Sequence, residues 1–97
     1  MWVVLFSPAA AKALVRPKSG IPEKVRGIAK ALRIDLEVSG PSQHRWPNYG
    51  KLKGRDDCRH CHLKKGKPTW VACWRILDHE KKVMEVYYVG THEKAPY

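Results

Sequence analysis

Residues 58–89, CRHCHLKKGKPTWVACWRILDHEKKVMEVYYV, decide the fold. They contain three runs rich in apolar, aromatic and β-branched residues, namely Cys58–Leu63, Thr69–Leu77 and Val83–Val89. The segments between these runs are short and rich in Lys, Gly, Pro and Asp, which is typical of hairpin turns. We therefore predict three consecutive antiparallel strands.

The part of the chain before these strands predicts one short strand and two helices. Trp2–Phe6 has the composition of a short buried strand. Ser7 is a candidate N-cap with Pro8 at the first helical position, which predicts a helix over residues 8–15 that ends near Pro17. A second helix is expected from about Pro22 to Gly40-Pro41. Its apolar residues follow a helical stripe: Val25, Ile28, Ala29, Leu32 and Leu36.

This order of elements predicts a single α+β domain over residues 1–97. We expect two N-terminal helices packed on one face of a small antiparallel sheet, in the order β-α-α-β-β-β. A chain of 97 residues that is 43% hydrophobic suffices for one modest core. The opposite face of the sheet is then free to bind a partner. A loop over residues 39–56 should join the second helix to the sheet, and loops of this length are often functional.

Positive charge is concentrated in the middle of the chain. The formal net charge is +10, and residues 45–68 carry eight Lys and Arg against two acidic residues. Such a patch is the electrostatic signature of a polyanion partner, and its histidines and aromatics favour nucleic acid over a merely solubilising surface. No stretch combines the basic residues with the bulky apolar face of a membrane-surface helix.

The apolar run Trp2–Phe6 does not have the form of a targeting or membrane segment. It is five residues long, has no basic lead-in and is followed by Ser7-Pro8. It is therefore too short for a signal peptide or a membrane span. We expect a soluble, cytoplasmic protein.

The motif Cys58-Arg59-His60-Cys61-His62 matches the attachment pattern of c-type haem and half of a zinc site. Two observations oppose a metal or haem group here. There is no second ligand pair at zinc-finger spacing, and on a strand Cys58 and Cys61 would point to opposite faces. We interpret the cysteines, Cys73 included, as free thiols that are largely buried, and expect no cofactor.

The same alternation along the strand places His60 and His62 on one face. Next to Lys64 and Lys65, these imidazoles could contact phosphate or transfer protons. Alternatively, they form hydrogen bonds within the sheet. The functional interpretation is better supported for His62 than for His60.

Two groups of aromatic residues differ in their surroundings. Trp70 and Trp74 share a strand face with Ala72 and Ile76, which favours a core position over base stacking. Trp46 and Tyr49 lie in the basic loop, where aromatics among cations suit stacking on bases. An equally weighted alternative is that the Trp46-Pro47 segment anchors the loop to the core.

Three stretches together resemble a RelE-like branch of the RelE/ParE toxin superfamily. They are the runs WPNYGKL (46–52), CHLKKGKPTWVACW (61–74) and EVYYVGTHEKAPY (85–97). The likeness extends over essentially the whole chain and its element order, and the last run is its most specific part. It implies a fold similar to that of microbial ribonucleases.

The resemblance also implies an activity and partners. Such toxins belong to type II toxin–antitoxin pairs, cut mRNA, usually on the ribosome, and are silenced by a bound antitoxin protein. RelE-type enzymes work without a metal: the ribose 2′-hydroxyl attacks the adjacent phosphate and the 5′-oxygen leaves. The reaction needs a base, an acid and cations that stabilise charge on the phosphate.

The family pattern suggests roles for particular residues. His92 falls where members place a catalytic Arg or His, and an imidazole can act as acid or base near neutral pH. Tyr97 falls where a terminal aromatic stacks on the nucleotide. We add His62 and Lys94 as further candidate catalytic residues. Candidate phosphate-binding residues are Arg45, Lys51, Lys53, Arg55, Arg59, Lys64, Lys65 and Arg75, and candidate stacking residues are Trp46 and Tyr49.

One departure from the pattern concerns the phosphate. RelE has an arginine early in the strand that begins here with Thr69-Trp70-Val71, whereas this sequence has an apolar residue. Phosphate stabilisation must then come from other cations. Two further functions remain open: a ParE-like gyrase inhibitor that is not a nuclease, and a non-catalytic RNA-binding module.

Overall fold

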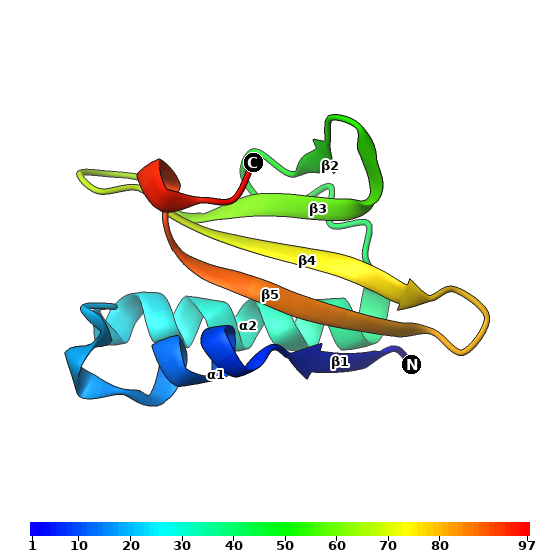
Figure 1. Cartoon of the computed structure of the whole chain (residues 1–97), viewed down its shortest axis with the longest axis horizontal. Coiled ribbons are helices and arrows are strands. Elements are labelled where there is room, and N and C mark those ends of the chain that lie inside the picture. The colour runs from blue at the N-terminus through cyan, green and yellow to red at the C-terminus, as the bar shows by residue number, and fades with distance from the viewer.

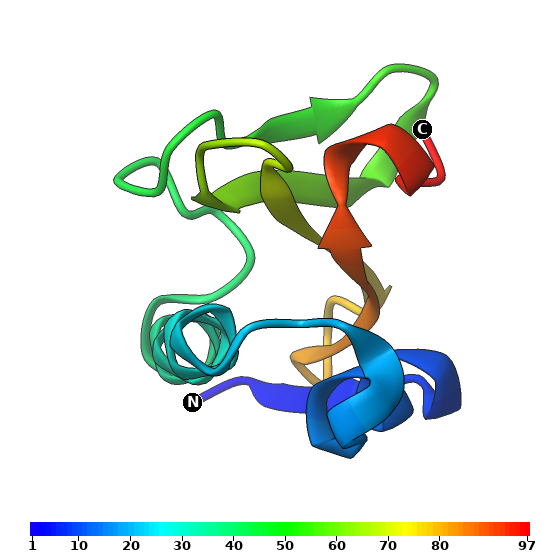
Figure 2. The ribbon, with the colours of Figure 1, turned by 90° about the vertical axis from the view of Figure 1, so that its left-hand side faces the viewer.

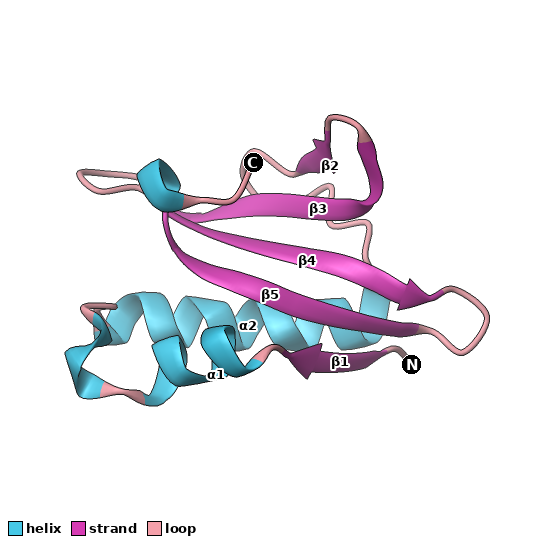
Figure 3. Cartoon of the chain, in the orientation of Figure 1, coloured by secondary structure: helices cyan, strands magenta, loops and turns pink.

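The computed structural model describes the backbone of residues 1–97 and every side chain except those of Pro17 and Asp56. It contains two α-helices, two short 3-10 helices and five strands (Figure 3). In chain order these are β1 (Val3–Phe6), α1 (Pro8–Val15), η1 (Pro17–Ser19), α2 (Glu23–Ser39), β2 (Gly50–Leu52), β3 (Arg55–Lys64), β4 (Trp70–Asp78), β5 (Val83–Thr91) and η2 (His92–Lys94).

The five strands form one sheet in the order β1-β5-β4-β3-β2 (Figure 1). The three central strands pair as the two predicted antiparallel hairpins. β1, however, pairs parallel with β5, from Val3 opposite Val83 to Phe6 opposite Val86. The sheet is therefore mostly, and not wholly, antiparallel. Two strands that are joined by a tight hairpin turn must be antiparallel. No such turn joins β1 to β5, so these two strands can pair in parallel.

The predicted loop over residues 39–56 contains an additional strand. β2 pairs with β3, with Gly50 opposite His60 and Lys51 opposite Arg59, and β3 begins at Arg55 and not at Cys58. Gly and Lys are poor strand formers, so composition alone indicated a loop. The β2–β3 hairpin brings basic residues to the edge of the sheet, where the candidate site lies.

The core lies between the helices and one face of the sheet. α2 contributes the stripe Val25, Ala29, Leu32 and Leu36, which is buried as its spacing predicted. From the sheet, Ala72 and Trp74 are fully buried in the same cluster, and Trp70 packs against it. The core interpretation of these tryptophans is thus confirmed.

Gly40 ends α2 in a conformation that requires glycine. Its φ is +87°, and a Cβ there would stand 2.8 Å from the indole Nε1 of Trp2. The backbone N–H of Trp2 in turn donates to the carbonyl of Glu37. The chain entering β1 is therefore held against the end of α2.

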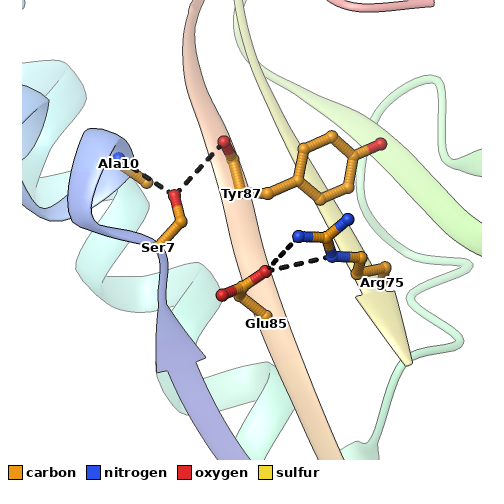
Figure 4. A network of polar contacts seen from close by, with 5 residues as sticks. All are labelled: Ser7, Ala10, Arg75, Glu85 and Tyr87. Carbon is orange, nitrogen blue, oxygen red and sulfur yellow. Dashed lines mark hydrogen bonds and ion pairs between the residues drawn. The ribbon is translucent and has the colours of Figure 1, made fainter. Parts of the chain in front are cut away.

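Ser7 joins the start of α1 to β5 (Figure 4). Its hydroxyl accepts a hydrogen bond from the backbone N–H of Ala10 at 3.2 Å and donates to the carbonyl of Tyr87 at 3.4 Å. The predicted N-cap is confirmed. In addition, the cap fixes α1 beside the strand that leads into the C-terminal segment.

Gly27 lies inside α2, and nothing in the fold requires glycine there. A Cβ at this position would meet no atom within 4 Å, and the residue is exposed. Glycine in a helix interior costs about 0.5–1 kcal/mol relative to alanine. We expect Gly27→Ala to raise the free energy of unfolding by about that amount in urea denaturation. A destabilised variant would contradict this assignment of the helix.

No helix in the part of the chain that the structure describes is both long enough and apolar enough to cross a membrane.

Candidate active site

The candidate site lies on the face of the sheet opposite α2. Alternation along β3 directs Cys61 and Leu63 into the core, so that His60 and His62 lie on the other face. After β5, η2 and the last residues turn across this face, and Figure 2 shows this C-terminal segment and α2 on different sides of the sheet. The backbone N–H of His92 donates to the carbonyl of Thr69 at 2.8 Å, which fixes where the segment leaves the sheet.

Four aromatic side chains meet there, and we call them the His–Tyr cluster: His60, His62, His92 and Tyr97. The ring centroids of His62 and His92 are 5.6 Å apart, and those of His92 and Tyr97 are 5.7 Å apart. The ring of His60 lies 5.0 Å from that of Tyr97 at an interplanar angle of 34°. The cluster therefore joins two residues of β3 to two residues that lie 30 or more positions further along the chain.

Burial and mutual repulsion lower the pKa of two of these imidazoles. The pKa of His60 is lowered mainly by burial and further by His62 and His92. The pKa of His62 is lowered by burial, and then by His92 and Lys65. Both rings are therefore predominantly neutral at pH 7, the form in which an imidazole accepts a proton.

Basic residues of the β2–β3 hairpin surround a hollow beside the cluster. This hairpin hollow has a volume of about 360 Å³ and is lined by Lys51, Leu52, Lys53, Arg55, His60 and Tyr97. Arg55 also donates to the backbone carbonyl of Pro96 at 3.3 Å. Three of the predicted phosphate-binding residues thus gather where the C-terminal segment ends, and Lys65 lies near His62.

The other predicted phosphate-binding residues lie elsewhere or are already engaged. Arg59 points to the core side of β3 and is 7% exposed, so its predicted contact with phosphate has no support in the geometry. Arg75 holds Glu85 at 2.6 Å and lies over the ring of Tyr87 (Figure 4). Arg45 lines a separate hollow at the end of α2. Lys64 is exposed at the end of β3.

Lys94, the remaining candidate catalytic residue, is exposed on η2. Among the side chains that the structure describes, no hydrogen bond or ion pair joins it to the His–Tyr cluster. Its role therefore stays a prediction that the geometry does not support.

Trp46 occupies the anchoring position given by the alternative interpretation, and Tyr49 also packs against the core. The indole N–H of Trp46 donates to Asp35 at 2.9 Å, and the ring of Tyr49 stacks on that of Trp74 at 6.0 Å. Both rings pack against the core cluster. The aromatic loop residues therefore hold the loop to the domain, which leaves Tyr97, 48% exposed, as the stacking candidate of the site.

The three cysteines are free thiols, two of them buried, in agreement with the sequence interpretation. Burial raises the pKa of Cys61 and of Cys73 to about 12, so neither is a thiolate near neutral pH. Cys61 lies in the core cluster, away from the face that carries His60 and His62. No group of three possible metal ligands occurs among the described residues.

No sequence pattern indicated that His60 contacts the C-terminal segment. The alternation of β3 placed His60 on the same face as His62, but its contact partner Tyr97 is 37 positions further along the chain. The contact between the two rings forms only because the C-terminal segment folds back over β3. Strand periodicity could show the shared face of His60 and His62, whereas the path of the tail was not encoded in any local pattern.

The lowered histidine pKa values predict how stability depends on pH. In the unfolded chain these imidazoles titrate near pH 6.5, whereas the folded protein resists protonating them. Below about pH 6.5 the unfolded state therefore binds more protons, and the free energy of unfolding should fall as the pH drops from about 7 to about 5. His60→Gln removes one such group and should flatten this slope in urea denaturation at a series of pH values. Equal slopes for the two proteins would show that His60 is not perturbed by folding.

Comparisons with known proteins bear on the fold. No protein-family model and no curated protein matches the sequence. Two solved structures match this chain in fold. A chain of the intact Escherichia coli RelBE toxin–antitoxin complex matches with a TM-score of 0.65 and 22% identity, over 93% of this chain and 95% of that one. The conserved hypothetical protein HP0894 from Helicobacter pylori matches with a TM-score of 0.59 and 17% identity, over 96% and 97%.

Both matches extend over nearly the whole of this chain and of the matched chain. They confirm the predicted α+β architecture of two helices packed on a small sheet, which has one strand more than predicted and is mostly antiparallel. The chain has the RelE-like fold.

Proposed function

We propose that this chain is the toxin of a type II toxin–antitoxin pair and acts as an mRNA endoribonuclease that inhibits translation. The observation that carries the proposal is the meeting of His62 and His92 beside the cation-lined hairpin hollow, on the face of the sheet opposite α2. Two imidazoles and several cations are the groups that phosphodiester cleavage requires.

In the proposed reaction the ribose 2′-oxygen attacks the adjacent phosphorus and the bond to the 5′-oxygen breaks. The products are a 2′,3′-cyclic phosphate and a 5′-hydroxyl. His62, kept neutral by its lowered pKa, takes the proton from the 2′-hydroxyl. His92, whose ring meets that of His62 edge to face at 5.6 Å, gives a proton to the departing 5′-oxygen. Charge that builds up on the phosphate oxygens is stabilised by Lys65 and the cations of the hairpin hollow.

Side chains supply every proton transfer in this scheme, so we propose that cleavage needs no metal. The net charge of +10 favours association with RNA, and Lys51, Lys53 and Arg55 from the basic stretch over residues 45–68 line the hairpin hollow. Following the resemblance, we propose that the natural substrate is mRNA held on the ribosome.

The proposed partner is a cognate antitoxin protein. The E. coli structure with the same fold is a toxin–antitoxin complex, which supports a partner of this kind. The charge of this chain favours an acidic antitoxin, because complementary charge speeds association. Co-expression with such a protein should restore growth that the chain alone arrests.

The proposal is tested by induced expression with mapping of mRNA 5′ ends. The natural chain should arrest growth and produce new mRNA ends within coding regions, whereas His92→Ala should do neither. Growth arrest with intact mRNA and a DNA-damage response would instead indicate a gyrase inhibitor. RNA binding without new ends would indicate a non-catalytic RNA-binding module.

A further inference from the structure

His60 is the member of the His–Tyr cluster that the proposed reaction does not use. It lies on β3 opposite Gly50 of β2, so it forms part of the floor of the hairpin hollow. Its Nδ1 is buried and has no hydrogen-bond partner among the described residues. The centroid of its ring lies 5.0 Å from that of Tyr97, with the two ring planes tilted by 34°.

Three contacts fix the position of Tyr97, two to its own ring and one to the preceding residue. His60 supports one side of the ring, and the edge-on ring of His92 approaches it at 5.7 Å. One residue earlier, the carbonyl of Pro96 accepts a hydrogen bond from Arg55 at 3.3 Å. These contacts place the ring between the proton-transfer pair and the hollow, with 48% of its surface still exposed.

The hollow itself has the properties of a nucleotide site. At about 360 Å³ it falls within the range of small-molecule sites, which is about 300–1,000 Å³. The buried side chain of Leu52 gives it an apolar wall, and Lys51, Lys53 and Arg55 give it a cationic rim. A flat base that stacks on an aromatic ring, with its phosphate at a rim of cations, is the ligand that such walls suit.

We propose that His60 is a positioning residue: its ring supports that of Tyr97, the residue that the resemblance already assigns to stacking on the nucleotide. This inference rests on the proposed function, since it assigns a positioning role within the same site. His60 acts through its ring and takes no part in proton transfer. It sets how firmly the neighbouring nucleotide is held, and thereby how the phosphate lies between His62 and His92.

The test measures binding of a fluorescent single-stranded 2′-deoxy oligonucleotide, which lacks the attacking hydroxyl and so is not cleaved. Tyr97→Ala should weaken binding about ten-fold, as expected for the loss of one stacked base. His60→Ala should weaken binding in the natural chain and have no further effect when Tyr97 is already alanine. His60→Phe keeps an aromatic face and should bind almost normally. The surface variant His79→Ala serves as the matched control, and circular dichroism confirms that each variant is folded.

Cleavage by the same variants separates positioning from catalysis. His60→Phe should retain cleavage of RNA, whereas His92→Phe and His62→Phe, which also keep an aromatic ring, should lose it. If the effects of His60→Ala and Tyr97→Ala on binding simply add, or if the natural chain does not bind the oligonucleotide, the inference is wrong. If the two residues are coupled in binding but the natural chain cleaves no RNA, the inferred role of His60 is supported and the proposed nuclease activity is wrong.

Discussion

His92→Ala should lower the rate of RNA cleavage by the purified protein by about 10²–10⁴-fold, the usual contribution of a positioned acid or base. His62→Ala should cause a loss of similar size. The two rings meet edge to face with their centroids 5.6 Å apart, and they are proposed to move the two protons of a single reaction. The double variant should therefore be little slower than either single variant, as is found for residues that act as a unit.

The measurement is the single-turnover rate on free RNA and on ribosomes carrying mRNA. His79→Ala is the matched control, because His79 is an exposed histidine that pairs with Asp57 at 3.0 Å and lies outside the His–Tyr cluster. It should cleave at the natural rate. Cleavage by His92→Ala at the rate of the control would remove His92 from the mechanism.

Trp74→Ala should lower the free energy of unfolding by about 3–5 kcal/mol, the cost of deleting a large aromatic side chain from a core. Trp74 is fully buried, its indole N–H donates to the carbonyl of Pro41 at 3.1 Å, and its ring carries the stacked ring of Tyr49. Small domains have only about 5–15 kcal/mol in total, so the variant should be close to unfolding at 37 °C.

Urea denaturation followed by circular dichroism measures this loss. Trp74→Phe provides the comparison, because it keeps a ring in the core and loses the hydrogen bond to Pro41. It should be less destabilised than Trp74→Ala. A loss below about 1 kcal/mol for Trp74→Ala would mean that β4 and the loop over residues 41–49 are not held together as described.

Local sequence patterns predicted the elements that depend on contacts between residues close together in the sequence. The Ser7-Pro8 cap, the apolar stripe of α2 and the two hairpins of β3, β4 and β5 were each evident from spacing and turn residues. Elements that depend on distant partners were not. β2 has the composition of a loop and is a strand because it pairs with β3. β1 pairs with β5, which lies near the other end of the chain.

The candidate site shows the same division. Strand alternation placed His60 and His62 together, and the resemblance singled out His92 and Tyr97, but no local pattern showed that the two pairs meet. Charge counting also failed to distinguish Arg59, which is buried on the core side, from the cations that line the hairpin hollow. Which cations face a site depends on the register of the strands.

The central claim is that the chain cleaves RNA by internal attack of the 2′-hydroxyl, with protein side chains moving the protons. The most direct test is to identify the ends of RNA cut by the purified protein in the presence of EDTA, with and without ribosomes, by mass spectrometry. The account predicts 2′,3′-cyclic phosphate and 5′-hydroxyl ends. Products with 5′-phosphate and 3′-hydroxyl ends, or cleavage that stops when EDTA is added, would contradict it.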